Sequence, residues 1–211
     1  MAPSICVVLN EVDDDATFHC DALAERFPDA RRIDYPAGER FDPADADAVV
    51  LTGSTAGVYE REDRPWIDEE IELVRRLRDR SVPTLGVCFG HQIVNVALGG
   101  SVEAGEMTAG LVTADLTAHP LFEGVGPAFP ALHGDRVTEM GDGLRRIAAA
   151  DHAAIFGTAH RNRPVWTVQF HPEIDASLTD ALAAYDWQMN GFSWADVTAD
   201  QVVRNFMRLL D

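Results

Sequence analysis

Two short segments carry residue types that together could perform nucleophilic catalysis. The first, residues 86–92 (GVCFGHQ), follows an apolar run and places Cys88 between two glycines. Glycines two positions on either side of a nucleophile let a strand turn sharply into a helix and expose the nucleophile. At a helix N-terminus the dipole favours a thiolate, and the N–H of Phe89 could hold an oxyanion. A buried structural cysteine on a tight turn would give the same pattern, so this segment needs a second observation.

The second segment, residues 169–173 (QFHPE), supplies a base and an acid. A catalytic cysteine needs a base that takes its proton and returns it to the leaving group, and a third group that fixes the tautomer of the base. His171 and Glu173 are two residues apart and leave an extended chain on the same side, while Pro172 stiffens the link. The two segments together predict a Cys88–His171–Glu173 triad.

Short apolar runs alternate with amphipathic stretches, which predicts an α/β fold with a mainly parallel central sheet flanked by helices. Residues 101–150 contain more turn residues and shorter apolar runs, among them 110–116 and 145–150, and this favours some antiparallel strands in the middle of the chain. We expect one domain over residues 1–211. The expected strands are 5–9, 48–51, 82–87 and 165–170, and the expected helices are 16–26, 65–79, the segment after Cys88, 177–189 and 199–210.

Both segments stand almost unmodified in the form that is typical of class I glutamine amidotransferases, and the resemblance extends over nearly the whole chain. It implies a flavodoxin-like fold in which the carboxyl ends of parallel strands meet at the site. It also implies that Cys88 attacks the side-chain amide of glutamine, releases ammonia and leaves a γ-glutamyl thioester that water hydrolyses. In this family His171 would be the base and then the acid, with Glu173 orienting it. The resemblance implies neither a metal nor another cofactor.

The same resemblance assigns a substrate pocket. Gly53, after the strand 48–51, would supply a second oxyanion donor beside Phe89, with Ser54 as the alternative donor, and Gln92 would help hold the substrate. The backbone of Gly134 and Asp135 would bind the α-groups of glutamine.

Three departures from the family pattern are visible. Residues 53–55 (GST) stand where many relatives have Gly-Gly-Pro, and Leu132 replaces a small polar residue. The first strand ends in Asn10-Glu11 without the motif of many GMP synthase subunits, although residues 59–67 resemble the GMP synthase-like stand-alone group.

The length of 211 residues fits an amidotransferase domain and leaves no room for an ATP site. The resemblance therefore implies a GMP synthase-like glutaminase that supplies ammonia to a separate ATP-dependent synthetase. Two alternatives remain open. One is a γ-glutamyl hydrolase or peptidase that uses the same triad without a partner, and the other is a non-catalytic regulatory module of the same fold.

The charge excludes several function classes. The chain has 35 acidic residues against 17 basic ones, for a formal net charge of −18, and every basic residue is arginine. This balance argues against nucleic acid and anionic membranes as partners. The absence of lysine excludes Schiff-base catalysis and the lysine phosphate loop. Acidic charge spread along a lysine-free chain predicts a halophilic protein.

No apolar run is long enough to span a membrane and no basic n-region opens the chain, so we expect a cytoplasmic location.

The remaining candidates have simpler interpretations. We expect Cys6 to pack in the core and Cys20, beside His19, to be a poor metal ligand. Asp175 competes with Glu173 as the orienting acid. We expect His91 to lie behind the site or against its own helix, the acidic run 13–15 to form a solvated helix cap, and surface or turn positions for His119, His152 and His160.

Overall fold

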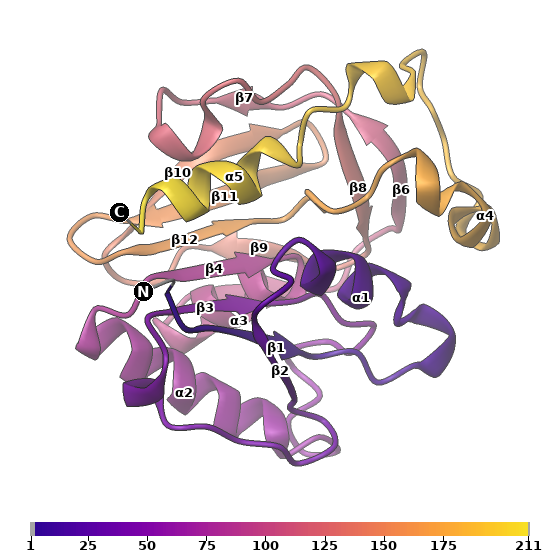
Figure 1. Cartoon of the computed structure of the whole chain (residues 1–211). Helices are drawn as coiled ribbons and strands as arrows, with labels where there is room; N and C mark the ends of the chain where they lie inside the picture. Colours follow the sequence, from indigo (N-terminus) through magenta and orange to yellow (C-terminus); the bar gives the residue numbers. More distant parts are fainter. Residues whose placement is uncertain (1–2, 211) are drawn as a thin grey trace.

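The computed structural model describes residues 3–210, and within them a mainly parallel sheet of eight strands forms the centre of the molecule (Figure 1). The order is β2-β1-β3-β4-β12-β11-β10-β7. The first five strands in this order are mutually parallel, and the last three are antiparallel to their neighbours. This confirms the predicted flavodoxin-like α/β fold. The strands are β1 (Ile5–Leu9), β2 (Arg31–Asp34), β3 (Ala48–Leu51), β4 (Thr84–Val87), β7 (Asp115–Leu116), β10 (Leu144–Ala150), β11 (Ala153–His160) and β12 (Val165–Val168).

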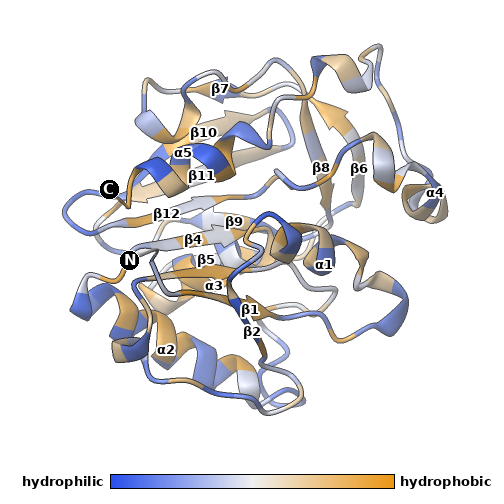
Figure 2. Ribbon diagram, viewed as in Figure 1, coloured by the Kyte–Doolittle hydropathy of each residue, from blue (hydrophilic) through white to orange (hydrophobic). Residues whose placement is uncertain are grey.

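Helices cover both faces of this sheet, and the sheet separates the core into two parts (Figures 1 and 2). On one face, α1 (Phe18–Glu25) and α5 (Gln201–Arg208) contribute to a core that includes Phe27, Phe170 and Phe206. On the other face, α2 (Trp66–Arg80) and α3 (Phe89–Ala97) pack an apolar stripe against β3 and β4. Because β3 and β4 are covered on both faces, all of their residues are buried, which explains why their sequences lack polar alternation.

Two smaller antiparallel pairs form in the middle of the chain, as predicted. They are β5 (Ser101–Glu103) with β9 (Arg136–Glu139), and β6 (Thr108–Val112) with β8 (Phe129–His133). Strand β8 matters for the site because it delivers the loop that starts at His133. Within the described residues, no helix is both long and apolar enough to cross a membrane.

The predicted helix 177–189 is wrong. The chain forms a 3-10 turn, the one-turn helix α4 (Thr179–Leu182) and another 3-10 turn, and Asp186 then adopts a left-handed conformation (φ 52°). Beyond this point Gln188 pairs with the edge of β6: its N–H donates to Ala109 O at 3.0 Å, and its carbonyl accepts from Leu111 N–H at 2.9 Å. This approach requires Gly110, because a Cβ there would lie 2.3 Å from Gln188 O. Long-range pairing therefore overrides the local helical pattern.

Other differences are smaller. Strand β2 was not expected, since it is an edge strand whose first two residues are exposed. Strand β11 was not expected either. Strands β4 and β12 are shorter than the predicted runs 82–87 and 165–170, because Pro83 and Gln169 pair outside the regular ladder.

Candidate active site

The sheet brings the candidate residues together at the carboxyl ends of three neighbouring strands. Strand β4 lies between β3 and β12, and its last residue, Val87, is in register with Val168. Cys88 follows β4, His171 follows β12, and Gly53 follows β3. Parallel strands end at the same edge, so residues that are far apart in sequence converge there.

The turn at Cys88 is strained and is held by backbone contacts. Cys88 has φ 53° and ψ −105°, a conformation that non-glycine residues rarely adopt. Its N–H donates to Val168 O at 2.9 Å, and Gly90 N–H donates to Thr52 O at 3.0 Å. The flanking glycines are needed for space, because a Cβ on Gly86 would lie 2.4 Å from Gly90 O and one on Gly90 would lie 2.4 Å from Leu51 O. Neighbouring strands thus fix the thiol at the start of α3.

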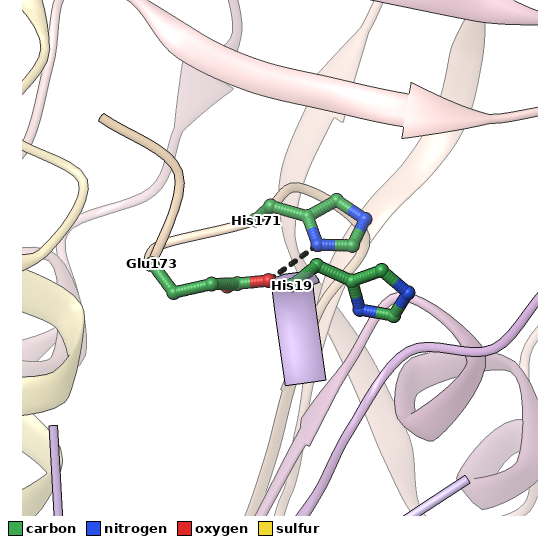
Figure 3. A group of neighbouring side chains, drawn as sticks. All are labelled: His19, His171 and Glu173. Atoms are coloured by element: carbon green, nitrogen blue, oxygen red, sulfur yellow. Dashed lines mark hydrogen bonds and ion pairs between the residues drawn. The ribbon is translucent and has the colours of Figure 1, made fainter. Parts of the chain in front are cut away.

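His171 and Glu173 form a buried pair (Figure 3), and the shared contact with Leu132 O places this pair beside the thiol. His171 Nδ1 lies 2.6 Å from Glu173 Oε1, and both residues are 1% exposed. His171 Nε2 lies 3.3 Å from Leu132 O, and the same carbonyl is 3.8 Å from Cys88 Sγ. A carboxylate and a carbonyl only accept hydrogen bonds, so both ring nitrogens can donate. Burial lowers the pKa of His171, but the charges and hydrogen bonds of Glu173 and Cys88 outweigh burial and raise it well above 6.5. The geometry therefore favours the imidazolium form.

The segment that carries Glu173 is tied to α1. Arg26 Nη2 donates to Glu173 O at 3.2 Å and to Asp175 Oδ2 at 2.7 Å. Asp175 also accepts from the backbone and side chain of Ser177 and is partly exposed. Asp175 is thus engaged away from His171, and Glu173 is the acid that contacts the imidazole.

A cavity of about 210 Å³ opens beside the thiol. Of the residues predicted for the site, Cys88, His171, Gln92, Gly134 and Asp135 line it. The other predicted residues lie behind this lining. Glu173 is behind His171, the ring of Phe89 packs in the core against Trp66, and the Phe89 N–H is the first of α3 and so lacks an intrahelical acceptor. Gly53 backs onto His171, since a Cβ on Gly53 would lie 3.2 Å from His171 Cε1.

A polar loop that is joined to α3 also lines the cavity. Gln92 Nε2 donates to Asp135 O at 3.2 Å, and His133 Nδ1 lies 3.0 Å from the same carbonyl. Tyr59 donates its hydroxyl to Asp135 Oδ1 at 3.2 Å, which joins the two sides of the cavity rim. Burial raises the pKa of Asp135, and the Tyr59 hydrogen bond opposes this. The exposed side chain of Met107 completes the rim.

One group of side chains within the described residues has the composition of a metal site. His19, His171 and Glu173 offer ligand atoms within 4.8 Å of one another (Figure 3). However, His171 Nδ1 is already bonded to Glu173 Oε1, and His19 Nε2 lies 2.8 Å from Glu11 Oε2. A metal ion held by Glu173 Oε1 and His171 Nδ1 would have to replace the hydrogen bond between them, so we interpret the group as part of a hydrogen-bonded network.

A comparison with family models identifies the chain. Residues 23–187 match the family described as glutamine amidotransferase class-I. The chain belongs to the class I glutamine amidotransferases. Both predicted motif strands, β4 and β12, lie within the matched region.

Curated relatives of this amidotransferase include GMP synthases [glutamine-hydrolyzing]. The protein from Gibberella zeae is 32% identical over 169 residues, which cover 71% of this chain and 30% of the relative. The one from Thermotoga maritima is 31% identical over 138 residues, covering 64% of this chain and 26% of the relative. The matches thus span about a quarter to a third of the length of these relatives.

Solved amidotransferase structures share the fold. A glutamine amidotransferase from Thermotoga maritima superimposes with a TM-score of 0.74 at 20% identity, covering 98% of this chain and 97% of that one. A glutamine amidotransferase from Methylobacillus flagellatus gives a TM-score of 0.71 at 17% identity, covering 100% and 91%.

Two buried groups of this amidotransferase are not among the site residues predicted from the sequence. Glu11 was not a candidate, and His19 was considered only as a metal ligand with Cys20. Both lie beside the site, where His19 lines the cavity. Their sequence spacing follows no catalytic pattern, and no local signal could have found them.

The other histidines and cysteines lie largely where they were expected. His91 is buried behind the strand-to-helix turn at residues 86–90, the elbow that carries Cys88, with Nδ1 2.7 Å from Thr167 Oγ1 and Nε2 3.2 Å from Ile155 O. Burial lowers its pKa to about 3, so it stays neutral and joins α3 to the sheet. Cys6 is in the core and Asp13 caps a 3-10 turn. His119 caps another 3-10 turn, and His152 lies in the turn between β10 and β11, where it contacts His133 at 3.1 Å. His160 is the last residue of β11 and is partly exposed.

Proposed function

We propose that this amidotransferase hydrolyses the side-chain amide of glutamine with Cys88 as nucleophile. The observation that carries the proposal is the strained Cys88 beside the buried His171–Glu173 pair, with thiol and imidazole against the same Leu132 carbonyl. A strained nucleophile at a helix start, a base next to it and an acid on the base form the arrangement that acyl transfer needs.

The reaction follows from this geometry. His171 takes the thiol proton and becomes the imidazolium that the site favours, and the thiolate attacks the carboxamide carbon of glutamine. The negative charge that forms on the carboxamide oxygen is stabilised by the N–H groups of Phe89 and Gly53. The imidazolium then gives its proton to the leaving nitrogen, and ammonia departs. His171 next deprotonates a water that attacks the γ-glutamyl thioester, which releases glutamate and restores the thiol. Glu173 keeps a proton on Nδ1 and stabilises the imidazolium throughout.

The cavity residues would orient glutamine. Gln92, Gly134 and Asp135 line the cavity together with Cys88 and offer amide, backbone and carboxylate groups to the α-amino and α-carboxyl groups of the substrate. We infer that the ammonia serves a separate ATP-dependent synthetase of the GMP synthase kind. This inference is supported by the curated relatives, which are GMP synthases and extend well beyond the matched part.

A γ-glutamyl hydrolase is the second candidate, because the rim of the cavity is open and apolar. Tyr59 is 53% exposed and Met107 is 61% exposed, so a leaving group larger than ammonia could rest there. Glutamate release from glutamine and from γ-glutamyl-p-nitroanilide, measured at high salt for the wild type and Cys88→Ala, tests both candidates. Release from glutamine that depends on Cys88 supports the glutaminase, whereas release from the anilide alone supports the hydrolase. If neither substrate releases glutamate, with or without a GMP synthase-type synthetase, the result supports a non-catalytic regulatory module.

A further inference from the structure

A second acid–histidine pair lies directly beside the triad. Glu11 follows β1, the strand next to β3, and its Oε2 lies 2.8 Å from His19 Nε2. The two side chains are only 2% and 6% exposed. The ring of His19 meets that of His171 edge to face, with centroids 5.4 Å apart, and Figure 3 shows His19 beside His171 and Glu173. This pair is not part of the reaction described above.

His19 is poorly placed to act as a base toward substrate. Its Nε2 is bonded to Glu11, and its Nδ1 lies 3.6 Å from Cys20 Sγ. The Cys20 sulfur is itself engaged with Thr52 Oγ1 at 3.0 Å and with Gly53 O at 3.5 Å. Both ring nitrogens are therefore directed at protein groups, so the pair acts through what it contacts.

What the pair contacts is the loop that follows β3. Both carboxylate oxygens of Glu11 accept from the N–H of Thr55, at 3.1 and 3.0 Å, and Oε1 also accepts from the Thr55 hydroxyl. The ring of His19 packs on Gly53, where an added Cβ would lie 3.0 Å from His19 Cε1 and 3.2 Å from His171 Cε1. Gly53 thus lies against two imidazole rings, and Glu11 binds the same loop two residues further on, at Thr55.

The pair can keep this role over a wide pH range. Burial raises the pKa of Glu11, but hydrogen bonds from His19, Thr55 and the backbone lower it to about 2. Burial lowers the pKa of His19, but its interactions with Cys20 and Glu11 raise it to about 10. A charged pair of this kind holds its partners more rigidly than neutral hydrogen bonds do.

We propose that Glu11 and His19 are positioning residues for the oxyanion-binding loop: the pair holds residues 53–55, of which Ser54 and Thr55 line the cavity, so that the N–H donor of this loop faces the oxygen of the scissile amide. This inference rests on the proposed function, because it deepens the role of the loop donor in that reaction. A displaced N–H donor weakens binding of the transition state more than binding of the substrate, because the oxygen carries charge only in the transition state. Loss of the pair should therefore lower kcat and leave KM nearly unchanged.

The test compares two reactions of Cys88 in the full-length chain. Glutamine hydrolysis passes through an oxyanion, whereas alkylation of the thiol by iodoacetamide does not. For Glu11→Ala we expect kcat to fall about 100-fold, within the range for loss of one oxyanion donor, while KM and the alkylation rate change less than about threefold. Glu11→Gln keeps an acceptor for Thr55 and should lose less, and Thr55→Val, which loses only its hydroxyl contact, should lose least.

Glu60→Ala is the matched control. Glu60 accepts the N–H of Gly57 at 3.1 Å in the next turn of the same loop and pairs with Arg64, without contact to residues 53–55. We expect wild-type kcat for this variant.

Several outcomes would overturn the proposal. A folded Glu11→Ala with wild-type kcat would do so, as would a parallel loss of hydrolysis and alkylation in Glu11→Gln and Thr55→Val, since a general structural defect affects both reactions. If Glu11→Ala does not fold, these two variants decide. If the wild type hydrolyses no glutamine, the proposed function fails instead. The series is then repeated with γ-glutamyl-p-nitroanilide, whose cleavage also forms an oxyanion.

Discussion

Replacing Glu173 with glutamine should destabilise the imidazolium form of His171, on which the reaction depends. The two side chains of the His171–Glu173 pair are at most 2% exposed, and Nδ1 and Oε1 are 2.6 Å apart. Burial alone lowers the pKa of His171, and Glu173 is the largest of the influences that raise it. Breaking a buried pair costs about 3 kcal/mol at the lower end of the measured range, which corresponds to about a 100-fold change in an equilibrium constant. The variant should therefore hold the imidazolium about 100-fold less well.

The alkylation rate of Cys88 by iodoacetamide at pH 6 measures this effect, because the thiolate that reacts is paired with that imidazolium. We expect peptide-resolved labelling of Cys88 to slow about 100-fold in Glu173→Gln, in line with the loss of the buried pair. Glu70→Gln is the control. Glu70 is also fully buried, and burial raises its pKa to about 8, so the amide replaces an acid that is already neutral at pH 6. Equal labelling rates at pH 6 in the wild type and Glu173→Gln would refute this reasoning.

Four further predictions follow from other parts of the molecule. Gly90→Ala should destabilise the fold by about 1–3 kcal/mol in urea unfolding, because its Cβ meets Leu51 O at 2.4 Å, and an unchanged midpoint would contradict the close packing at the elbow. The stability advantage of the wild type over Glu11→Gln should be largest between pH 4.5 and 6.5. It should shrink as pH rises toward 10, where His19 deprotonates, and as pH falls toward 2, where Glu11 is protonated; a flat difference in melting temperature would contradict this. The melting temperature should rise between about 0.01 and 1 M NaCl, because salt screens the repulsion within a chain of net charge −18. A melting temperature independent of salt would argue against the predicted halophilic surface. Among the triad variants, Cys88→Ala should abolish turnover, His171→Ala should nearly do so, and Glu173→Ala should cost less, whereas equal residual activity in all three would contradict the assigned roles.

The parts of the site that could be predicted from the sequence are those whose chemistry depends on adjacent residues. The elbow needs glycines at fixed distances from Cys88, and the base and its acid follow one strand, so both segments are visible as short patterns. The alternation of apolar runs and amphipathic stretches predicts the parallel sheet in the same way. The carboxyl ends of neighbouring parallel strands then bring these segments together.

The parts that could not be predicted depend on contacts between distant residues. Glu11 and His19 belong to the site because β1 lies next to β3, and their link to Thr55 spans 44 residues. The expected helix 177–189 is interrupted because Gln188 finds a partner at Gly110, which the helical pattern does not contain. In both cases the deciding interaction is a tertiary one.

The acidic surface and the candidate site should respond differently to salt. The −18 charge is spread along the chain, whereas the candidate chemistry uses groups that are nearly all buried, among them the fully enclosed Glu173. Low exposure shields such a pair from salt, so high ionic strength should affect the surface much more than the triad.

Intact-mass spectrometry of the chain quenched in acid during turnover of glutamine tests the central claim most directly. We predict that the wild type carries one additional γ-glutamyl group, that digestion places it on Cys88, and that hydroxylamine removes it as expected for a thioester. Cys88→Ala should show no such adduct. Turnover of glutamine by the Cys88→Ala variant, or a γ-glutamyl group on another residue, would contradict the account.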